Sequence, residues 1–189
     1  DTIKDFSIEV ENHNYEYFKV KGKQSYKAAR CRVEGDYSQA AFGLVAGTLN
    51  GNITCNDLES GSLQGDKCII DILTEMGADL VVKDNSVTAR SSKTFGITID
   101  ASQCPDLVPP LAVLGALSKG TTRIINAGRL RIKESDRLKA ISTELSKLGA
   151  KIAESPDGLE IYGRDMLEGG TVDSWNDHRI AMALAVAAL

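Results

Sequence analysis

The sequence predicts an α/β repeat fold in which parallel helices are buried inside and sheets lie outside. Three observations lead to this prediction. Similar segments recur at intervals of about 70 residues, and each unit alternates helical with extended stretches. The first helix of each unit is almost entirely apolar, and a helix that is apolar on all sides is usually buried on all sides. The sheets are therefore expected to form the outer layer.

Three aspartates mark the repeat. Asp36, Asp106 and Asp177 stand 70 and 71 residues apart, and each precedes a run of apolar residues. An aspartate at a helix start can accept hydrogen bonds from the free N–H groups there, so each is expected to cap a helix. Asp66 and Asp136, again 70 residues apart, are expected to begin the second helix of the first two units.

The other elements follow in the same order in each unit. The first helix ends near a glycine and leads into a β-rich run, expected at 52–58 and 121–125. A second, amphipathic helix ends at Gly77 or Gly149. Two strands joined by a tight turn close each unit, and they are expected at 78–82 with 86–90 and at 150–154 with 158–163.

The repeats also set the expected domain boundaries. Residues 1–33 have no repeat partner, and a strand pair is expected there at 15–21 and 28–33. Residues 34–189 contain the repeats. The third unit stops after one apolar helix, and the chain is therefore interpreted as truncated. The expected divisions are 34–103, 104–174 and the beginning of a third unit at 175–189.

Composition bounds the class of protein. Hydrophobic residues make up 42% of the 189 residues and charged residues 25%, which is typical of a globular fold and not of a disordered chain. No apolar run approaches the roughly 18 residues of a membrane helix, so no membrane partner is expected. The net charge of −4 disfavours a nucleic-acid partner, because phosphates are bound by clustered Lys and Arg.

The cysteines and histidines show no metal-ligand spacing. Cys31, Cys55, Cys68 and Cys104 form no CxxC pair, so a zinc site is not expected. Scattered cysteines are typical of small buried hydrophobes in the reducing cytosol, which favours a cytoplasmic protein, although a disulfide pair stays open. His13 lies in a polar stretch and is expected at the surface.

Residues 130–138 form the most charged stretch. Lys133, Glu134 and Arg137 stand at the start of an expected helix, where the helix dipole disfavours cations. Such a conflict is often functional, and cationic side chains beside free helix N–H groups make an anion site. On charge pattern alone, however, a solvated helix start with ion pairs is favoured over an anion site.

A second cluster lies at 175–180. Asp177, His178 and Arg179 stand at a repeat start, and the simplest interpretation is a cap, a satisfied polar residue and an ion partner. Helices related by a repeat, however, bring their N-termini to one end of a domain. The cations of both clusters would then meet in a positive field, which favours an anionic, phosphorylated small ligand.

Asp106 admits two interpretations. It follows Pro105, which fits the first turn of a helix, so Asp106 can act as a cap. A carboxylate among apolar residues and near cations can equally act as a general base.

Both charged clusters resemble motifs of the 5-enolpyruvylshikimate-3-phosphate synthase family. RIKESDRL at 131–138 and NDHRIAM at 176–182 are similar to two highly specific strings of that family, and 33–41, 64–66 and 105–106 resemble it in register. The likeness covers essentially the whole chain. It implies two domains of three repeats each with helices inside, with residues 1–33 ending the first domain and 34–189 forming part of the second.

The resemblance also implies the reaction. Such an enzyme, a 3-phosphoshikimate 1-carboxyvinyltransferase, moves the enolpyruvyl group of phosphoenolpyruvate to the 5-hydroxyl of shikimate 3-phosphate and releases phosphate, on the shikimate pathway to chorismate and aromatic amino acids. No metal or organic cofactor is implied. The parent is expected to be monomeric. This piece alone is expected to be inactive and to self-associate through exposed apolar surface.

The family's roles carry over to matching positions. The resemblance implies that Asp106 binds the shikimate hydroxyls and accepts the proton. It implies that Lys133 contacts shikimate 3-phosphate, and that Glu134 protonates and later deprotonates the methylene carbon of the enolpyruvyl group.

The resemblance further implies that Arg137 and Arg179 bind phosphoenolpyruvate, and a guanidinium suits bidentate binding of carboxylate or phosphate. Asp177 and His178 would line or brace that site. Arg129 departs from the pattern, because some relatives carry an asparagine there that contacts the shikimate ligand.

Alternatives from other classes stay open. UDP-N-acetylglucosamine enolpyruvyl transferase shares the fold but not these strings. A non-catalytic binding module on the same fold is disfavoured by the joint presence of Asp106, Glu134, Arg137 and Arg179. RNA 3′-phosphate cyclase, which has related repeats, would need a nucleotide site, and the acidic balance disfavours RNA.

Overall fold

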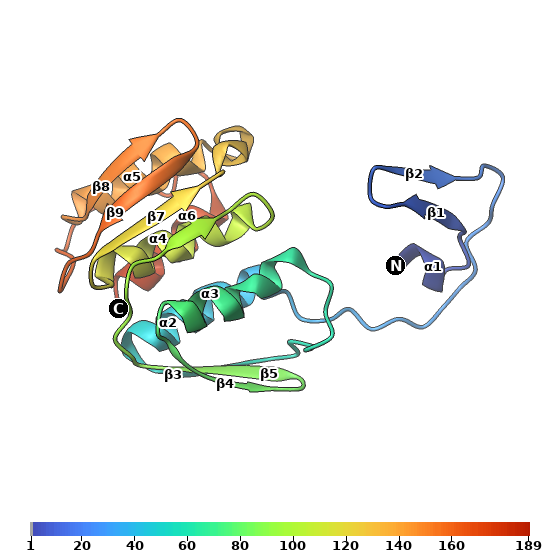
Figure 1. The fold of residues 1–189 in the computed structure, drawn as a ribbon, viewed down its shortest axis with the longest axis horizontal. Helices are drawn as coiled ribbons and strands as arrows, with labels where there is room; N and C mark the ends of the chain where they lie inside the picture. Colours follow the sequence, from blue (N-terminus) through green and yellow to red (C-terminus); the bar gives the residue numbers. More distant parts are fainter. Residues whose placement is uncertain (1) are drawn as a thin grey trace. The chain divides into compact units, whose positions relative to one another are not determined.

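The structure is a computed structural model that describes residues 2–189, and these form two compact units. The first unit ends at Val33, and the second spans Glu34–Leu189. The first unit contains a short helix and a two-stranded hairpin (Figure 1): α1 (Thr2–Asp5), β1 (Val10–His13) and β2 (Tyr17–Val20).

The hairpin of the first unit differs from the expectation. Strand β2 lies within the predicted stretch 15–21, but it pairs antiparallel with β1, from Val10↔Val20 to His13↔Tyr17. Residues 28–33, which the structure describes, form no strand, and their side chains are exposed. The short connection between β1 and β2 allows a local hairpin, whereas residues 28–33 pair with neither strand of that hairpin.

The first repeat builds a three-stranded antiparallel sheet with the order β3-β5-β4. Helices α2 and α3 lie along it (Figure 1). The elements are α2 (Tyr37–Asn50), β3 (Asn52–Asn56), the 3₁₀ turn η1 (Gly65–Cys68), α3 (Ile69–Glu75), β4 (Asp79–Lys83) and β5 (Ser86–Arg90).

The second repeat builds a four-stranded sheet with the order β6-β7-β9-β8, in which β6 and β7 are parallel. The helix of the third unit, α6 (His178–Ala187), follows it. The elements of the second repeat are β6 (Thr98–Asp100), η2 (Pro105–Leu107), α4 (Val108–Leu117), β7 (Thr121–Ile125), η3 (Gly128–Ile132), α5 (Arg137–Lys147), β8 (Lys151–Ser155) and β9 (Gly158–Tyr162).

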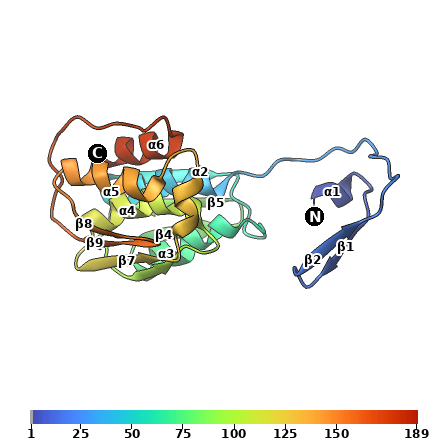
Figure 2. The same cartoon turned by 90° about the horizontal axis from the view of Figure 1, so that it is seen from above.

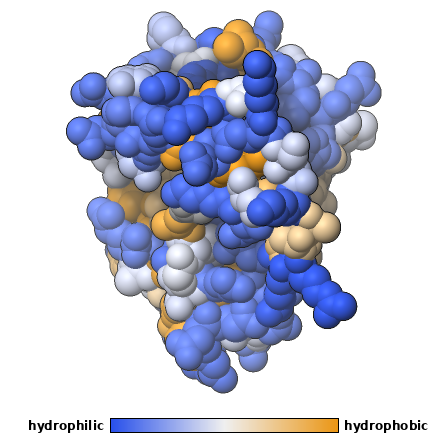
Figure 3. Space-filling model, turned by 90° about the vertical axis from the view of Figure 1, so that its right-hand side faces the viewer, coloured by the Kyte–Doolittle hydropathy of each residue, from blue (hydrophilic) through white to orange (hydrophobic). Residues whose placement is uncertain are grey.

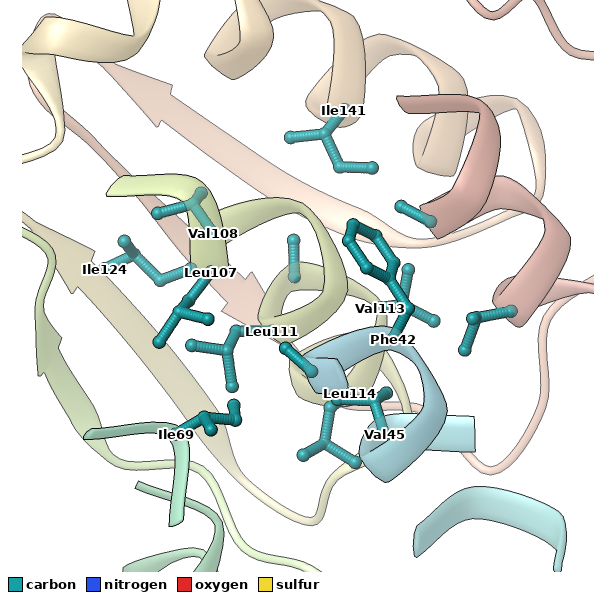
Figure 4. Close-up of a cluster of buried hydrophobic side chains, with 14 of the residues drawn as sticks. Phe42, Val45, Ile69, Leu107, Val108, Leu111, Val113, Leu114, Ile124 and Ile141 are labelled. Carbon is teal, nitrogen blue, oxygen red and sulfur yellow. The ribbon is translucent and has the colours of Figure 1, made fainter. Parts of the chain in front are cut away.

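The helices form the inner layer, as the sequence predicts. Nine residues of α4, all but Leu117, are buried, and this helix packs against α2, α5, α6 and the second sheet. The strands bury one face and leave the other to solvent, as the alternating exposure of β3 and β7 shows. Figure 4 shows the core between the elements, with Leu111 of α4, Phe42 and Val45 of α2 and Ile124 of β7.

Helix α6 lies at the edge of the inner layer, and part of its surface is exposed. It packs on α4, α2 and α5 (Figure 2), while the burial of each residue shows Ala181 and Ala185 to be exposed. Figure 3 shows one face of the molecule, on which hydrophilic residues predominate and apolar residues gather in small patches. No helix among the described residues is long and apolar enough to cross a membrane.

The helix boundaries confirm most of the predicted signals. Asp36, Asp136 and Asp177 each accept a backbone N–H of the helix that follows. Gly77 and Gly149 follow the second helices with φ values of 91° and 84°, a left-handed conformation that glycine adopts without strain.

The predicted cap at Asp106 is wrong, and Asp66, which was expected to begin the second helix, lies in a short turn just before that helix. Both residues lie inside the 3₁₀ turns η1 and η2 that precede the helices. In η2 the side chain of Asp106 makes no capping hydrogen bond. It forms ion pairs with three cations instead.

The prediction for the cysteines is only partly correct. All four cysteines, each within the described part of the chain, are free thiols. Cys104 is buried, as expected, but Cys55 and Cys68 are half-buried and Cys31 is exposed. His13 is exposed, as predicted.

Candidate active site

Four helix starts of the second unit meet at one site. Side chains from the beginnings of α2, α5 and α6 and from the turn before α4 contact one another directly. The sequence places a charged or polar residue at each of these starts. Six of the seven candidate residues come together there: Asp106, Lys133, Glu134, Arg137, Asp177 and Arg179.

Arg137 is the centre of the site. It is the first residue of α5, and its side chain is only 1% exposed. Its Nε lies 2.7 Å from Asp177, its Nη1 donates to Asp106 at 2.9 Å, and its Nη2 donates to Glu134 at 2.5 Å. A buried guanidinium needs this many acceptors, because an unpaired charge in the interior is costly.

Asp177 holds the start of α6 to Arg137. Its carboxylate is fully buried and accepts hydrogen bonds from Arg137, from the backbone N–H of Arg179 and from the hydroxyl of Ser135. Burial acts to raise the pKa of Asp177, but these hydrogen bonds outweigh it and leave the pKa below its usual value. Asp177 is therefore a fixed anion.

Asp106 bridges three cations. One carboxylate oxygen lies 2.9 Å from Arg137 and 3.5 Å from Lys133, and the other lies 3.3 Å from Arg179. The side chain stays 25% exposed, so it can be reached by a ligand. Of the two interpretations of Asp106, the geometry excludes the cap.

The guanidinium group of Arg179 is only partly paired. Its side chain is 9% exposed, and Nη2 donates to Ser38 at 2.9 Å. Its Nη1 is buried without a hydrogen-bond partner among the described residues. An unpaired buried donor of this kind is costly in a native structure, and an anionic ligand would satisfy it.

Ser38 is a site residue that the sequence analysis does not predict. It lies at the start of α2, where its hydroxyl accepts from Arg179 and donates to Asp36 at 2.8 Å. The repeat contains the signal, because Ser38 stands two residues after Asp36 as Arg179 stands two after Asp177.

Asp66 is a second residue near the site that the sequence analysis does not predict. Burial and the charge of Asp106 raise its pKa, and the nearby cations Arg179 and Lys133 offset this only in part. Its place in η1, at the repeat interval from Asp136, gave no sign of this neighbourhood.

The seventh candidate, His178, lies at the edge of this cluster, and two further cations, Arg129 and Arg131, stand in the adjoining charged stretch. His178 is 54% exposed, and its Nδ1 is 4.0 Å from Asp177. Arg129 is exposed. Arg131 instead secures the start of α5, since it bonds Asp136 at 2.9 Å and Glu154 at 2.9 Å.

The cluster suits an anionic ligand. It combines two buried guanidinium groups with an ammonium group, and the acids beside them can exchange partners when an anion arrives. Among the described residues no group of three or more His, Cys, Asp or Glu side chains could hold a metal ion.

The fold and the site together define a protein class: an α/β repeat protein with buried helices and an anion site at the helix starts. The chain matches the family described as EPSP synthase (3-phosphoshikimate 1-carboxyvinyltransferase) over residues 1–189, and it belongs to that family.

Curated relatives carry the same name. The 3-phosphoshikimate 1-carboxyvinyltransferases of Clostridium acetobutylicum and Clostridium novyi are 61% and 60% identical to the chain over 189 residues. The chain spans 44% and 43% of their lengths. The solved EPSP synthase of Acinetobacter baumannii matches 98% of the chain with a TM-score of 0.85 at 26% identity, and the chain covers 46% of it.

Proposed function

We propose that this chain is part of a 3-phosphoshikimate 1-carboxyvinyltransferase, which transfers the enolpyruvyl group of phosphoenolpyruvate to the 5-hydroxyl of shikimate 3-phosphate and releases phosphate. The observation that carries the proposal is the contact of Asp106 with Lys133, Arg137 and Arg179. It brings a carboxylate base and three cations together where two anionic substrates would meet. The family membership supports the same reaction.

The two units fit this assignment. Residues 1–33 would end the first domain of the enzyme, and 34–189 would form two repeats and the start of the third in the second domain. Because the chain spans less than half of its curated relatives, the remaining ligands of the substrates would come from the rest of the protein. The free cysteines are consistent with a cytoplasmic enzyme.

Asp106 and Lys133 would serve the shikimate substrate. The exposed edge of Asp106 would bind the hydroxyls of shikimate 3-phosphate and accept the proton of the 5-hydroxyl as it attacks. Lys133, whose Nζ lies 3.5 Å from Asp106 and whose side chain is 32% exposed, would contact the same substrate beside the reacting oxygen. Its charge would stabilise negative charge that develops there.

Arg137, Arg179 and Glu134 would serve phosphoenolpyruvate. The free Nη1 of Arg179 would bind its carboxylate or phosphate. Glu134 is half-exposed, so it can leave Arg137 when the substrate anion takes its place. Once released, it can take up a proton from solvent, donate that proton to the methylene carbon, and take a proton back from the same carbon as phosphate leaves. Asp177 and His178 would brace the site.

Phosphate release by the full-length protein tests the proposal. We expect release with phosphoenolpyruvate plus shikimate 3-phosphate, and no release with phosphoenolpyruvate plus UDP-N-acetylglucosamine. Release with the UDP-sugar alone would assign the protein to the sister transferase, and release with neither would leave a binding module.

Variants would then test the roles. Asp106→Asn and Glu134→Gln should lower kcat by about a hundredfold or more, because each removes a proton-transfer group. Arg179→Ala should chiefly raise KM for phosphoenolpyruvate. Arg123→Ala is the matched control, since Arg123 forms an exposed ion pair with Glu160 on the outer sheet face and should retain full activity.

The isolated 189-residue chain should be inactive and should self-associate. Among the described elements α6 packs chiefly on other helices and leaves Ala181 and Ala185 exposed, and Leu189 is 64% exposed. Light scattering at several concentrations would measure the association, and a monomer at every concentration would contradict it.

A further inference from the structure

The segment that leads into α6 is a strained turn. Trp175 and Asn176, two consecutive residues other than glycine, have φ values of 56° and 53°. Such left-handed conformations cost about 1–3 kcal/mol each and persist only where the surroundings fix them. Asp177 and Arg179 follow at once, so this turn decides where both enter the site.

A buried carboxylate on α5 fixes the turn. Glu144 has a side chain that is only 1% exposed, yet it takes part in none of the contacts of the candidate site. Its Oε1 accepts a hydrogen bond from the indole Nε1 of Trp175 at 2.8 Å, and its Oε2 accepts one from the backbone N–H of Asp173 at 2.9 Å. Lys147 donates to both oxygens at 2.8 Å.

These bonds keep Glu144 charged. Burial acts to raise its pKa, but the hydrogen bonds from Lys147, Trp175 and Asp173 outweigh burial and lower the pKa. The turn is closed further by the bond from the N–H of Trp175 to the side chain of Asp173 at 2.5 Å. Asp173 and Trp175 are thus both held to α5 by the carboxylate of Glu144.

Helix α5 therefore contacts the segment at the start of α6 at two points. Arg137 bonds Asp177, and Glu144, seven residues and about two helical turns further on, bonds Trp175. We propose that Glu144 is a positioning residue for the anion site: by fixing the turn at Trp175, it sets Asp177 against Arg137 and brings Arg179 to Asp106. The inference rests on the proposed function for the identity of the anion.

Kinetics of the full-length enzyme test this role. In Glu144→Gln the amide keeps the shape but places a donor against the N–H of Asp173 or the indole. We expect KM for phosphoenolpyruvate to rise between about tenfold and about a hundredfold, as small misplacements in a site do. KM for shikimate 3-phosphate should stay within about twofold.

Two further variants make the test sharp. Trp175→Phe removes the indole donor and keeps an aromatic ring, and it should also raise KM for phosphoenolpyruvate. This variant tests the positioning role even if Glu144→Gln fails to fold. Glu160→Gln is the control, because Glu160 lies on β9 in a half-exposed ion pair with Arg123 and should change neither KM. A lower Tm for Glu144→Gln and Trp175→Phe with unchanged KM for phosphoenolpyruvate would overturn the proposal.

Binding of inorganic phosphate separates this inference from the proposed function. If the wild-type protein does not turn over phosphoenolpyruvate, the proposed function fails. Calorimetric titration with inorganic phosphate then decides: weaker binding to Glu144→Gln and Trp175→Phe than to the wild type supports the positioning role. Equal binding, or none to the wild type, refutes it.

Discussion

Asp177 holds the guanidinium of Arg137 by two hydrogen bonds, 2.7 and 3.2 Å long, and neither side chain is more than 1% exposed. The pair joins the start of α5 to the start of α6 across 40 residues of sequence. The carboxylate of Asp177 carries its charge in this pair, because its pKa lies below its usual value. The stability of the second unit should thus depend on this contact.

Replacement of Asp177 by asparagine should be strongly destabilising. It leaves Arg137 buried with one fewer anionic partner, and the loss of one member of a buried pair costs about 3–5 kcal/mol. Urea unfolding would measure the loss. In the control, Asp79→Asn, an exposed ion pair with Arg90 at 3.8 Å is removed, and less than about 1 kcal/mol should be lost. Similar effects of both substitutions would contradict the role of the pair.

The same contact predicts a pH dependence. The pKa of Asp177 is lower in the folded than in the unfolded chain, so the folded state stabilises the ionised form. This contribution is complete above the ordinary aspartate pKa of about 4 and is lost as the pH falls through the lowered value. The difference in unfolding free energy between wild type and Asp177→Asn should therefore be constant above about pH 5 and shrink in acid.

Asp66 should behave in the opposite way. Burial and the charge of Asp106 raise its pKa, so the ionised form is disfavoured in the folded state. Its contribution is present below the ordinary aspartate pKa and is lost as the pH rises through the raised value. Asp66→Asn should increase stability at neutral pH by about 0.5–2 kcal/mol, and the gain should vanish in acid. A decrease at pH 7 in thermal unfolding would contradict this account.

The half-buried thiols Cys68 and Cys55 should differ in reactivity. The neighbouring thiol of Cys104 lowers the pKa of Cys68, whereas burial raises the pKa of Cys55. Because the thiolate is the nucleophile, iodoacetamide should alkylate Cys68 several-fold faster than Cys55. Mass spectrometry of timed digests would measure both rates. In Cys104→Ala the advantage of Cys68 should disappear, and an unchanged rate there would contradict the Cys104 thiol as its cause.

Gly47 tests the packing of α2 on its sheet. Alanine in a helix interior is ordinarily more stable than glycine by about 0.5–1 kcal/mol. A Cβ at Gly47, however, would lie 2.8 Å from the carbonyl oxygen of Ala89 on β5. Gly47→Ala should therefore destabilise the protein by about 1–3 kcal/mol in denaturant unfolding. Gly61→Ala, where no atom lies within 4 Å, should change little.

The repeat and the apolar helices were enough to predict the architecture of the second unit. The strands expected at 86–90 and 121–125 are found with these bounds, because alternating residues and flanking turns specify them locally. The strand expected at 28–33 is absent from the described residues. Its partner had no sequence signal, and strand pairing depends on a neighbouring edge as much as on composition.

The charged members of the site could be predicted, and their supports could not. Arg137 and Arg179 stood out because cations at helix starts conflict with the helix dipole. Ser38 and Glu144 resemble ordinary helix residues, and only their partners distinguish them. Those partners lie 141 and 31 residues away, so their roles depend on the packing of whole elements.

The ion pairs of Arg137 have a consequence for how the second unit unfolds. Stacked repeats can open one at a time when each contacts its neighbour only through apolar faces. Here a single buried guanidinium joins the turn before α4, the start of α5 and the start of α6, so release of one element exposes an unpaired charge in the others. Amide protons of α4, α5 and α6 should accordingly exchange with solvent in one cooperative step.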